Sequence, residues 1–140
     1  MPIVDLKSNA PDGWRDRVLS HYRFPPYWWI RGLSGESRRA LMARDLDHAL
    51  ASDTAQLIGY VSDAGELTGF ASMQRLDWDT RHFGVEMWRV EHLGTCLGSD
   101  ERWAVAQALA HEVVTLVHRL EIDNVQARIP TDNLPAIHGF

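Results

Sequence analysis

The sequence predicts an α+β domain in which helices cover a mixed sheet, and three observations support this fold class. Four apolar runs have the length and composition of strands, at 56–61, 66–73, 85–93 and 124–129. The first two are joined by the turn 62–65, which indicates an antiparallel hairpin. A long amphipathic pattern separates the last two, as is typical of a strand–helix–strand unit with parallel strands. We therefore expect an antiparallel meander followed by a βαβ unit.

Helical patterns occupy much of the remaining sequence. After a turn-rich opening, helices are predicted at 14–22 and 35–50. The helix between the last two strands begins at Ser99 or Asp100. Its predicted apolar stripe consists of Trp103, Ala106, Ala110, Val113, Val117 and Leu120. A final helix is predicted to begin near Leu134, after an N-cap signal.

Composition bounds the size and class of the protein. The chain has 140 residues, 45% of them hydrophobic and 24% charged, so it can form one domain with a real core. We divide this domain, 1–140, into a helical and aromatic segment, 1–52, and a sheet-forming segment, 53–140. A net charge of −5 disfavours general nucleic-acid binding, because neutralising phosphates requires a basic surface. The run 24–30 contains two prolines and four aromatics, and we expect it to pack against the sheet.

Cysteine usage and hydropathy indicate the compartment. The single cysteine, Cys96, permits no intrachain disulfide, and the N-terminus shows no charged and apolar leader. No apolar stretch approaches the roughly 20 residues that a spanning helix needs. We therefore expect a soluble, cytoplasmic protein that has no membrane partner. Because no H-x-x-x-H or C-x-x-C pattern occurs, we expect no metal site.

Two motifs carry a resemblance to a known family. Residues 76–84 read Leu-Asp-Trp-Asp-Thr-Arg-His-Phe-Gly, and Asn133-Leu134-Pro135-Ala136-Ile137 stands at a predicted helix start. With the order of the predicted elements, these motifs resemble the GCN5-related N-acetyltransferase superfamily, in which two helices and a hairpin precede a strand–helix–strand cofactor motif. The first motif is similar to the L-x-W-D-[ST]-x-x-F-G stretch of a branch that includes sugar-amine acetyltransferases. The resemblance covers roughly residues 45–140.

The resemblance implies that acetyl-CoA is the co-substrate and a small amine the acceptor. In this family two neighbouring parallel strands splay apart to receive the pantetheine arm, and here they would be 89–95 and 124–129. The cofactor-binding residues implied in this way are Leu93, Gly94, Thr95, Gly98, Ser99 and Asn133. Backbone groups of Leu93, Gly94 and Thr95 would pair with pantetheine. Backbone amides of Gly98 and Ser99 would hold the pyrophosphate at a helix N-terminus.

Acyl transfer to an amine needs a base, and the strand next to the thioester offers Glu91 and His92 as catalytic candidates. Adjacent strand residues point to opposite faces, so we expect only one of them to face the site. Each has an alternative interpretation. Glu91 would be a solvated strand charge, and His92 a hydrogen-bonded structural imidazole.

The motif at 76–84 supplies candidate substrate-binding residues, namely Trp78, Asp79, His82 and Phe83. The alternative is a turn in which Asp77 or Asp79 binds backbone amides while Trp78 fills the core. For Trp78 and Asp79 we favour this structural interpretation over substrate binding. The same reasoning applies to His82 and Phe83.

Two departures from the family pattern keep a second function open. The loop after Thr95 has one glycine, Gly98, where the family pattern has more, and Asp100 and Glu101 follow it. The family fold also continues with two further strands, so the C-terminus is expected to be truncated. The alternative function is a non-catalytic domain of the same fold that binds a ligand or partner. A strand 124–129 without a further neighbour would leave an open edge, from which we expect a homodimer.

Overall fold

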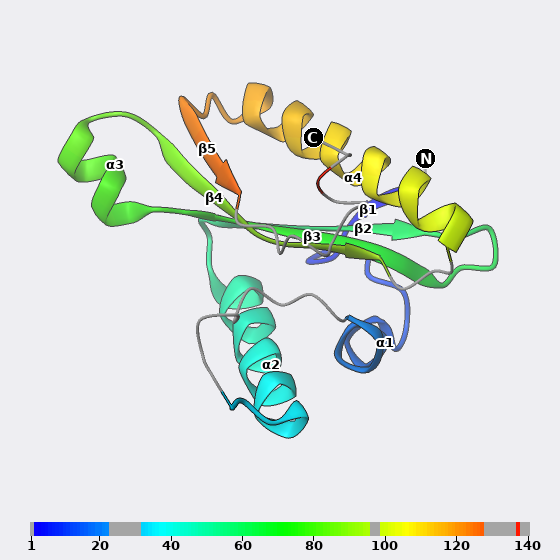
Figure 1. The fold of residues 1–140 in the computed structure, drawn as a ribbon. Coiled ribbons are helices and arrows are strands. Elements are labelled where there is room, and N and C mark those ends of the chain that lie inside the picture. The colour runs from blue at the N-terminus through cyan, green and yellow to red at the C-terminus, as the bar shows by residue number, and fades with distance from the viewer. Residues whose placement is uncertain (1, 23–31, 96–98, 128–136, 138–140) are drawn as a thin grey trace.

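The structure is a computed structural model that describes residues 2–22, 32–95, 99–127 and 137, with Ser99 and Asp100 described by backbone alone. Its centre is a five-stranded sheet in the order β1-β2-β3-β4-β5 (Figure 1). The strands are β1 (Ile3–Asp5), β2 (Ala55–Val61), β3 (Leu67–Arg75), β4 (Met87–Thr95) and β5 (Asn124–Ala127). The pairs from β1 to β4 are antiparallel, and β4 pairs with β5 in parallel. The predicted meander followed by a βαβ unit is confirmed.

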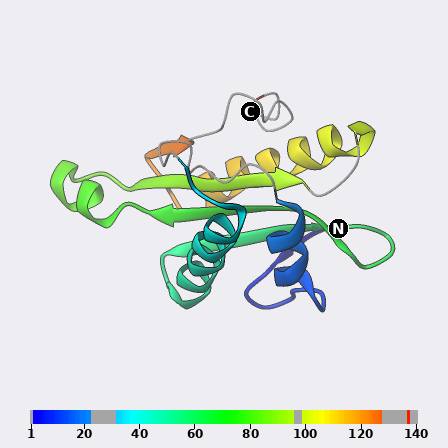
Figure 2. The same ribbon diagram turned by 60° about the horizontal axis from the view of Figure 1, so that its bottom comes forward.

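Helices lie on both faces of this sheet. They are α1 (Trp14–His21), α2 (Gly35–Ala51), α3 (Asp77–Phe83) and α4 (Ser99–Arg119). Helix α4 lies along one face, while α1 and α2 lie against the other (Figures 1 and 2). Helix α3, in the connection from β3 to β4, projects beyond the end of the sheet (Figure 1). The predicted α+β fold class is therefore confirmed.

Each face of the sheet has its own apolar core. The core under α4 contains Trp88, Val90 and Leu93 of β4 together with residues of β2, β3 and α4. The α4 residues in it are Val105, Ala106, Leu109, Val113 and Leu116. This stripe is rotated from the predicted one, because Trp103 stays 38% exposed. The second core joins α1 and α2 to the sheet through residues such as Val18, Leu46, Leu57 and Phe70.

The opening residues form a strand that the sequence pattern did not predict. Ile3–Asp5 pairs antiparallel with β2, with Ile3 opposite Tyr60 and Asp5 opposite Ile58. Three residues are too few to show a strand's alternation, so the turn signals dominated the prediction. Asp5 then ends the strand by accepting a hydrogen bond from the Lys7 amide at 2.9 Å.

The segment that contains Trp78 forms a short helix, and the expectation that Trp78 fills the core is wrong. Its side chain is 62% exposed and stacks on His82 with ring centroids 4.7 Å apart. The helix places Trp78 and His82 one turn apart on its outer surface. Instead, Thr80 is buried and tethers α3 to β4, since its hydroxyl accepts from the Met87 amide at 3.0 Å.

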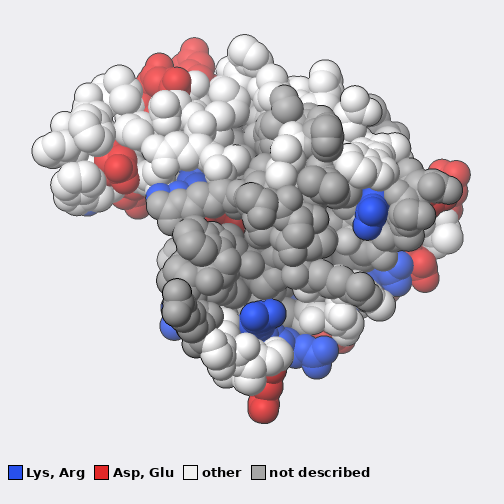
Figure 3. Space-filling model, viewed as in Figure 1, with Lys and Arg blue, Asp and Glu red and all other residues white. Residues whose placement is uncertain are grey.

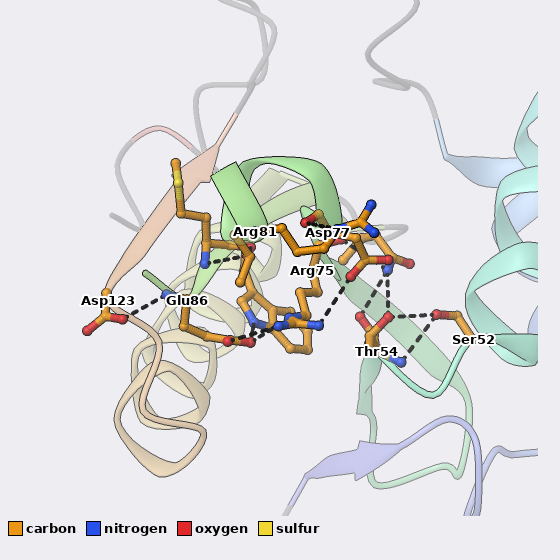
Figure 4. A network of polar contacts seen from close by, with 11 residues as sticks. Ser52, Thr54, Arg75, Asp77, Arg81, Glu86 and Asp123 are labelled. Carbon is orange, nitrogen blue, oxygen red and sulfur yellow. Dashed lines mark hydrogen bonds and ion pairs between the residues drawn. The ribbon is translucent and has the colours of Figure 1, made fainter. Parts of the chain in front are cut away.

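A polar network fixes the base of α3 (Figure 4). Arg75 at the end of β3 forms an ion pair with Glu86, which precedes β4; Arg75 Nε lies 2.9 Å from Glu86 Oε1. Arg75 Nη2 also donates a hydrogen bond to Glu86 Oε2 at 3.4 Å. The same Glu86 carboxylate accepts from Trp88 Nε1 at 2.9 Å. The Glu86 amide donates to the Asp123 carboxylate at 2.8 Å, which joins the network to the start of β5. Because Arg75 also pairs with Asp77 of α3 at 3.4 Å, the network couples α3 to three strands.

A β-bulge interrupts β4 at the point that matters for function. Ser72 of β3 lies opposite His92, and the next residue, Met73, lies opposite Val90. Glu91 is therefore the extra residue of a bulge. The bulge shifts the alternation of side chains, so that Val90 and Leu93, three residues apart, both face the α4 core.

No helix in the described part of the chain combines the length and apolarity that crossing a membrane requires.

Candidate active site

A cavity of about 190 Å³ lies between α2 and the strands β3 and β4. Its lining residues are Asp45, His48, Ala49, Ser72, Met73, Gln74, Glu91 and His92. Three elements thus bring two carboxylates and two imidazoles to one small space. Such a set can bind a cationic amine and accept its proton.

The bulge brings both predicted base candidates to this cavity. Without it, Glu91 and His92 would point to opposite faces of β4, as we expected from the strand period. With Glu91 as the extra residue, both line the cavity on the α2 side. The expectation that only one of them faces this side is therefore wrong, since a bulge resets the alternation of side chains.

Glu91 is the accessible member of this pair. Its side chain is 36% exposed, and Arg89 Nη1 lies 3.8 Å from its carboxylate. This ion pair on the same face of β4 is long and partly solvated, so it contributes little to stability. The carboxylate can therefore exchange its partner for a ligand at low cost.

His92 is buried, and protein groups engage both of its ring nitrogens. It is 3% exposed; Nε2 lies 3.1 Å from Asp45 Oδ2, and Nδ1 lies 3.2 Å from the Tyr22 hydroxyl. Its ring also stacks on Phe70 at 6.1 Å between centroids. This is the hydrogen-bonded imidazole of the alternative interpretation.

Tyr22 is a site residue that the sequence analysis missed. It follows the last residue of α1 and lies 70 positions from His92 in the sequence. Its ring meets Phe70 edge-on at 4.9 Å and lies against Gly94, where an added Cβ would be 2.4 Å from Tyr22 Cε2. No local motif marks this residue, because only the docking of α1 on the sheet brings it to β4.

A second cavity, of about 350 Å³, lies between α1 and α2. Its lining includes Tyr22, Arg38, Arg39 and Met42. Basic side chains are visible on the α1 and α2 side of the molecule, at the bottom of the view in Figure 3. Tyr22 therefore lines this partly basic cavity and contacts His92, which lines the acidic one.

A third and larger cavity, of about 730 Å³, lies near the start of α4, and its lining includes Tyr60 of β2, Asp63 of the turn between β2 and β3, and Glu101 of α4. Among the described residues, none of the predicted site residues lines it. We therefore place the candidate site in the smaller cavity, where the base candidates converge.

The predicted cofactor residues are only partly described. Leu93 and Gly94 are buried on β4, and Thr95 ends that strand. The ladder between β4 and β5 pairs Met87–Val90 with Asn124–Ala127, and β4 continues beyond it. Ser99 begins α4. Gly98 and Asn133 lie outside the described residues, as does the aromatic run 24–30.

The predicted substrate-binding residues are not brought to the cavity. Trp78, Asp79, His82 and Phe83 belong to α3, and none of them lines it. Helix α3 precedes the first residues of β4, whereas Glu91 and Gly94 lie further along that strand. At about 3.3 Å per residue, the distance from Met87 to Gly94 along the strand is about 23 Å. Their role in substrate binding stays a prediction, as does the homodimer.

Metal ligands are not clustered in this site. Across the described ranges, no three His, Cys, Asp or Glu side chains lie close enough together to hold an ion. Asp45 and His48 line the same cavity, but Asp45 already accepts a hydrogen bond from His92.

Comparisons by sequence found no match, either among family models or among curated proteins. Comparisons by structure found similar solved structures. A protein described as a probable acetyltransferase matches with a TM-score of 0.68 and 13% identity, over 99% of this chain and 85% of the other. Ribosomal-protein-alanine N-acetyltransferase of Brucella melitensis matches at 0.59 and 14%, over 99% and 84%. An aminoglycoside acetyltransferase from an uncultured soil sample matches at 0.57 and 8%, over 88% and 74%.

These matches concern the fold rather than the acceptor. The last two proteins are named for different acceptors, yet their TM-scores of 0.59 and 0.57 are nearly the same. The narrower resemblance to a sugar-amine branch is therefore not supported.

Proposed function

The chain has the fold of the GCN5-related N-acetyltransferases, and from this premise we propose that it transfers an acyl group from acyl-CoA to a small amine. Acetyl-CoA is the proposed donor. The observation that supports the proposal most directly is the bulge in β4. It turns Glu91 and His92 toward one cavity, a few residues before the stretch 93–95 that the resemblance assigns to the pantetheine arm.

The charges of the cavity suit an amine acceptor. Asp45 and Glu91 come from different elements and line the same space of about 190 Å³. Two carboxylates at a partly enclosed site attract an ammonium group, and their attraction is stronger there than in bulk water. We propose that the acceptor's amine binds here, beside Glu91.

The proposed reaction begins with loss of a proton from the ammonium. Glu91, which is accessible and only loosely paired with Arg89, accepts this proton and passes it to solvent. The free amine then attacks the thioester carbonyl. A C–N bond forms, the C–S bond breaks, and the amide and the thiol of coenzyme A are released.

The donor is proposed to lie along β4, as the resemblance implies. Backbone groups of Leu93, Gly94 and Thr95 would bind pantetheine, and Gly98, Ser99 and Asn133 would contact the rest of coenzyme A. Gly94 carries no side chain, so the Tyr22 ring lies directly against its backbone within this stretch.

The test is release of free thiol from acetyl-CoA in the presence of amines of three kinds. Kanamycin, a peptide with N-terminal alanine, and putrescine represent a sugar amine, a protein amine and a simple diamine. We expect at least one of them to be acetylated. In that reaction Glu91→Gln should lower kcat by about 10²–10⁴-fold, the range for loss of a general base. Glu66→Gln is the matched control, since Glu66 lies in the exposed hairpin turn region and pairs only loosely with Arg17, at 3.6 Å.

Two results would contradict the proposal. If the chain binds acetyl-CoA but acetylates none of the three amines, the alternative of a non-catalytic binding domain is favoured. If transfer occurs and Glu91→Gln has the same kcat as Glu66→Gln, Glu91 is not the base.

A further inference from the structure

We propose that the Ser72 hydroxyl binds the ammonium group of the acceptor, and that the acceptor is a compact aliphatic primary amine. The inference rests on the proposed acyl transfer and names the substrate class of the same cavity. Ser72 belongs to β3 and lines the cavity of about 190 Å³ together with Glu91 and His92 of β4.

The Ser72 hydroxyl is buried and lacks a hydrogen-bond partner in the described part of the protein. The residue is 4% exposed, and no other residue in the described ranges forms a hydrogen bond with this hydroxyl. Ser72 lies opposite His92, but Asp45 and Tyr22 already engage both ring nitrogens of that imidazole. Buried polar groups without a partner lower stability and are rare in folded proteins. A partner for Ser72 can reach it from the cavity.

Gln74, the next residue on the same face of β3, has a similar unpaired atom. It lies about 7 Å further along the strand and lines the same cavity. Its Nε2 donates to the carbonyl oxygens of Thr54 at 3.0 Å and of Arg75 at 3.3 Å, and this fixes the orientation of the amide because only its NH2 group can donate. Gln74 Oε1 is buried and has no partner among the described residues. The unpaired polar atoms of this wall are therefore oxygens.

The lining favours a cationic ligand that carries several N–H donors. Asp45 and Glu91 contribute carboxylates, which only accept hydrogen bonds when ionised, and a serine hydroxyl can also accept. Glu91 is the bulge residue between the pairs Ser72–His92 and Met73–Val90, so its backbone lies next to Ser72.

A primary ammonium has three N–H donors and can contact Glu91 and Ser72 at the same time. Once Glu91 has taken one proton, Ser72 still holds the neutral amine through one of its two remaining N–H groups. The nitrogen lone pair is then available to attack the thioester. Ser72 thus acts as a binding residue and takes no part in proton transfer.

The volume of the cavity limits the size of the acceptor. At about 30 Å³ for each water molecule, about 190 Å³ corresponds to roughly six such molecules, or about six non-hydrogen atoms. Putrescine has this size, whereas kanamycin, with its linked sugar rings, extends far beyond it. Ala49 of α2 adds apolar surface to the lining, which suits a methylene chain.

The first test measures binding of putrescine to the full chain by calorimetry, without acetyl-CoA. Ser72→Ala should raise the dissociation constant by about 10–100-fold, the range for loss of a hydrogen bond to a charged group. The same variant should unfold at an equal or higher urea concentration than wild type, because it removes a buried hydroxyl without a protein partner. Unchanged putrescine binding, or a lower midpoint of urea denaturation, would overturn the inference, since a purely structural hydroxyl gives these results.

Thr68→Val is the matched control. Thr68 also carries a buried hydroxyl on β3 and is 2% exposed, but it donates to the Tyr60 carbonyl at 3.2 Å and lines a different cavity. This variant should unfold at a lower urea concentration and bind putrescine as wild type does. If it weakens putrescine binding as much as Ser72→Ala, the effect is not specific to the cavity and the role of Ser72 is wrong.

The thiol-release assay tests the substrate class and separates this inference from the proposed function. We expect a higher kcat/KM for putrescine than for kanamycin, and the reverse order would overturn the assignment of a compact amine. Wild type that binds putrescine through Ser72 but releases no thiol would refute acyl transfer and leave the ligand site standing. Wild type that transfers the acetyl group but does not bind millimolar putrescine would refute the ligand site alone.

Discussion

The contact between Gly94 and the Tyr22 ring leads to a prediction with a defined sign. An alanine Cβ at position 94 would lie 2.4 Å from Tyr22 Cε2 and 2.6 Å from Cδ2. Ordinary contacts begin at 3.4 Å, so the ring would have to move by about 3.4 − 2.4 = 1.0 Å. Phe70 and His92 confine that ring. We therefore expect Gly94→Ala to destabilise the fold by about 1–3 kcal/mol, the range for overpacking a core.

Removal of the ring should reverse the effect. In the Tyr22→Ala background the added methyl meets open space, and alanine in a strand is favoured over glycine by about 0.5–1 kcal/mol. The same substitution is then expected to be neutral or mildly stabilising. The difference between the two backgrounds, about 1–4 kcal/mol, is the coupling between the two positions.

Urea denaturation followed by circular dichroism would measure this cycle. Gly69→Ala is the control, because its Cβ would meet Val105 Cγ1 at 2.4 Å on the opposite, α4 face of the sheet. Tyr22→Ala should not relieve its cost. If Gly94→Ala costs the same free energy of unfolding with and without the Tyr22 ring, then Tyr22 does not lie against β4.

Two further predictions concern stability away from the site. Glu86→Gln should lower the free energy of unfolding by about 1 kcal/mol, because Arg75 and Trp88 both lose a charged partner in a half-buried setting. Asp47→Asn removes the exposed ion pair with Arg15, and in the same urea titration it should lower the free energy of unfolding by less than about 0.5 kcal/mol. Ser34→Ala removes the acceptor for the Ser37 amide at the start of α2 and should lower the free energy of unfolding by about 1 kcal/mol. An unchanged midpoint of urea denaturation would show that this N-cap does not stabilise the fold.

The fold could largely be predicted from the sequence, because it rests on local patterns. The hairpin around 62–65, the helix from Ser99 and the parallel strand at Asn124 each have a strong signal within a few residues. Strand β1 has no such signal, since Ile3–Asp5 is held by pairing with β2 far along the chain. The exposed Trp78 was mispredicted for a related reason. Large aromatics are buried on average, but the local helix turns this one outward.

The candidate site was half predictable. Glu91 and His92 were found because they lie on the strand that the resemblance assigns to the cofactor. The sequence did not predict that both side chains face the same side of the sheet. The bulge that causes this depends on how β3 pairs with β4, and the alternation of residues along β4 does not reveal it. Tyr22 and Asp45 lie 70 and 47 positions from His92, so only the folded chain brings them together.

Calorimetric titration of acetyl-CoA into the 140-residue chain is the most direct test of the proposed acyl transfer, with adenosine 3′,5′-bisphosphate as the fragment control. The proposed site predicts one equivalent bound with a micromolar dissociation constant, about −8 kcal/mol, and weaker binding of the fragment because it lacks the pantetheine arm that runs along β4. No heat of binding at millimolar acetyl-CoA would contradict the proposal, since a chain that cannot hold the donor cannot transfer its acyl group.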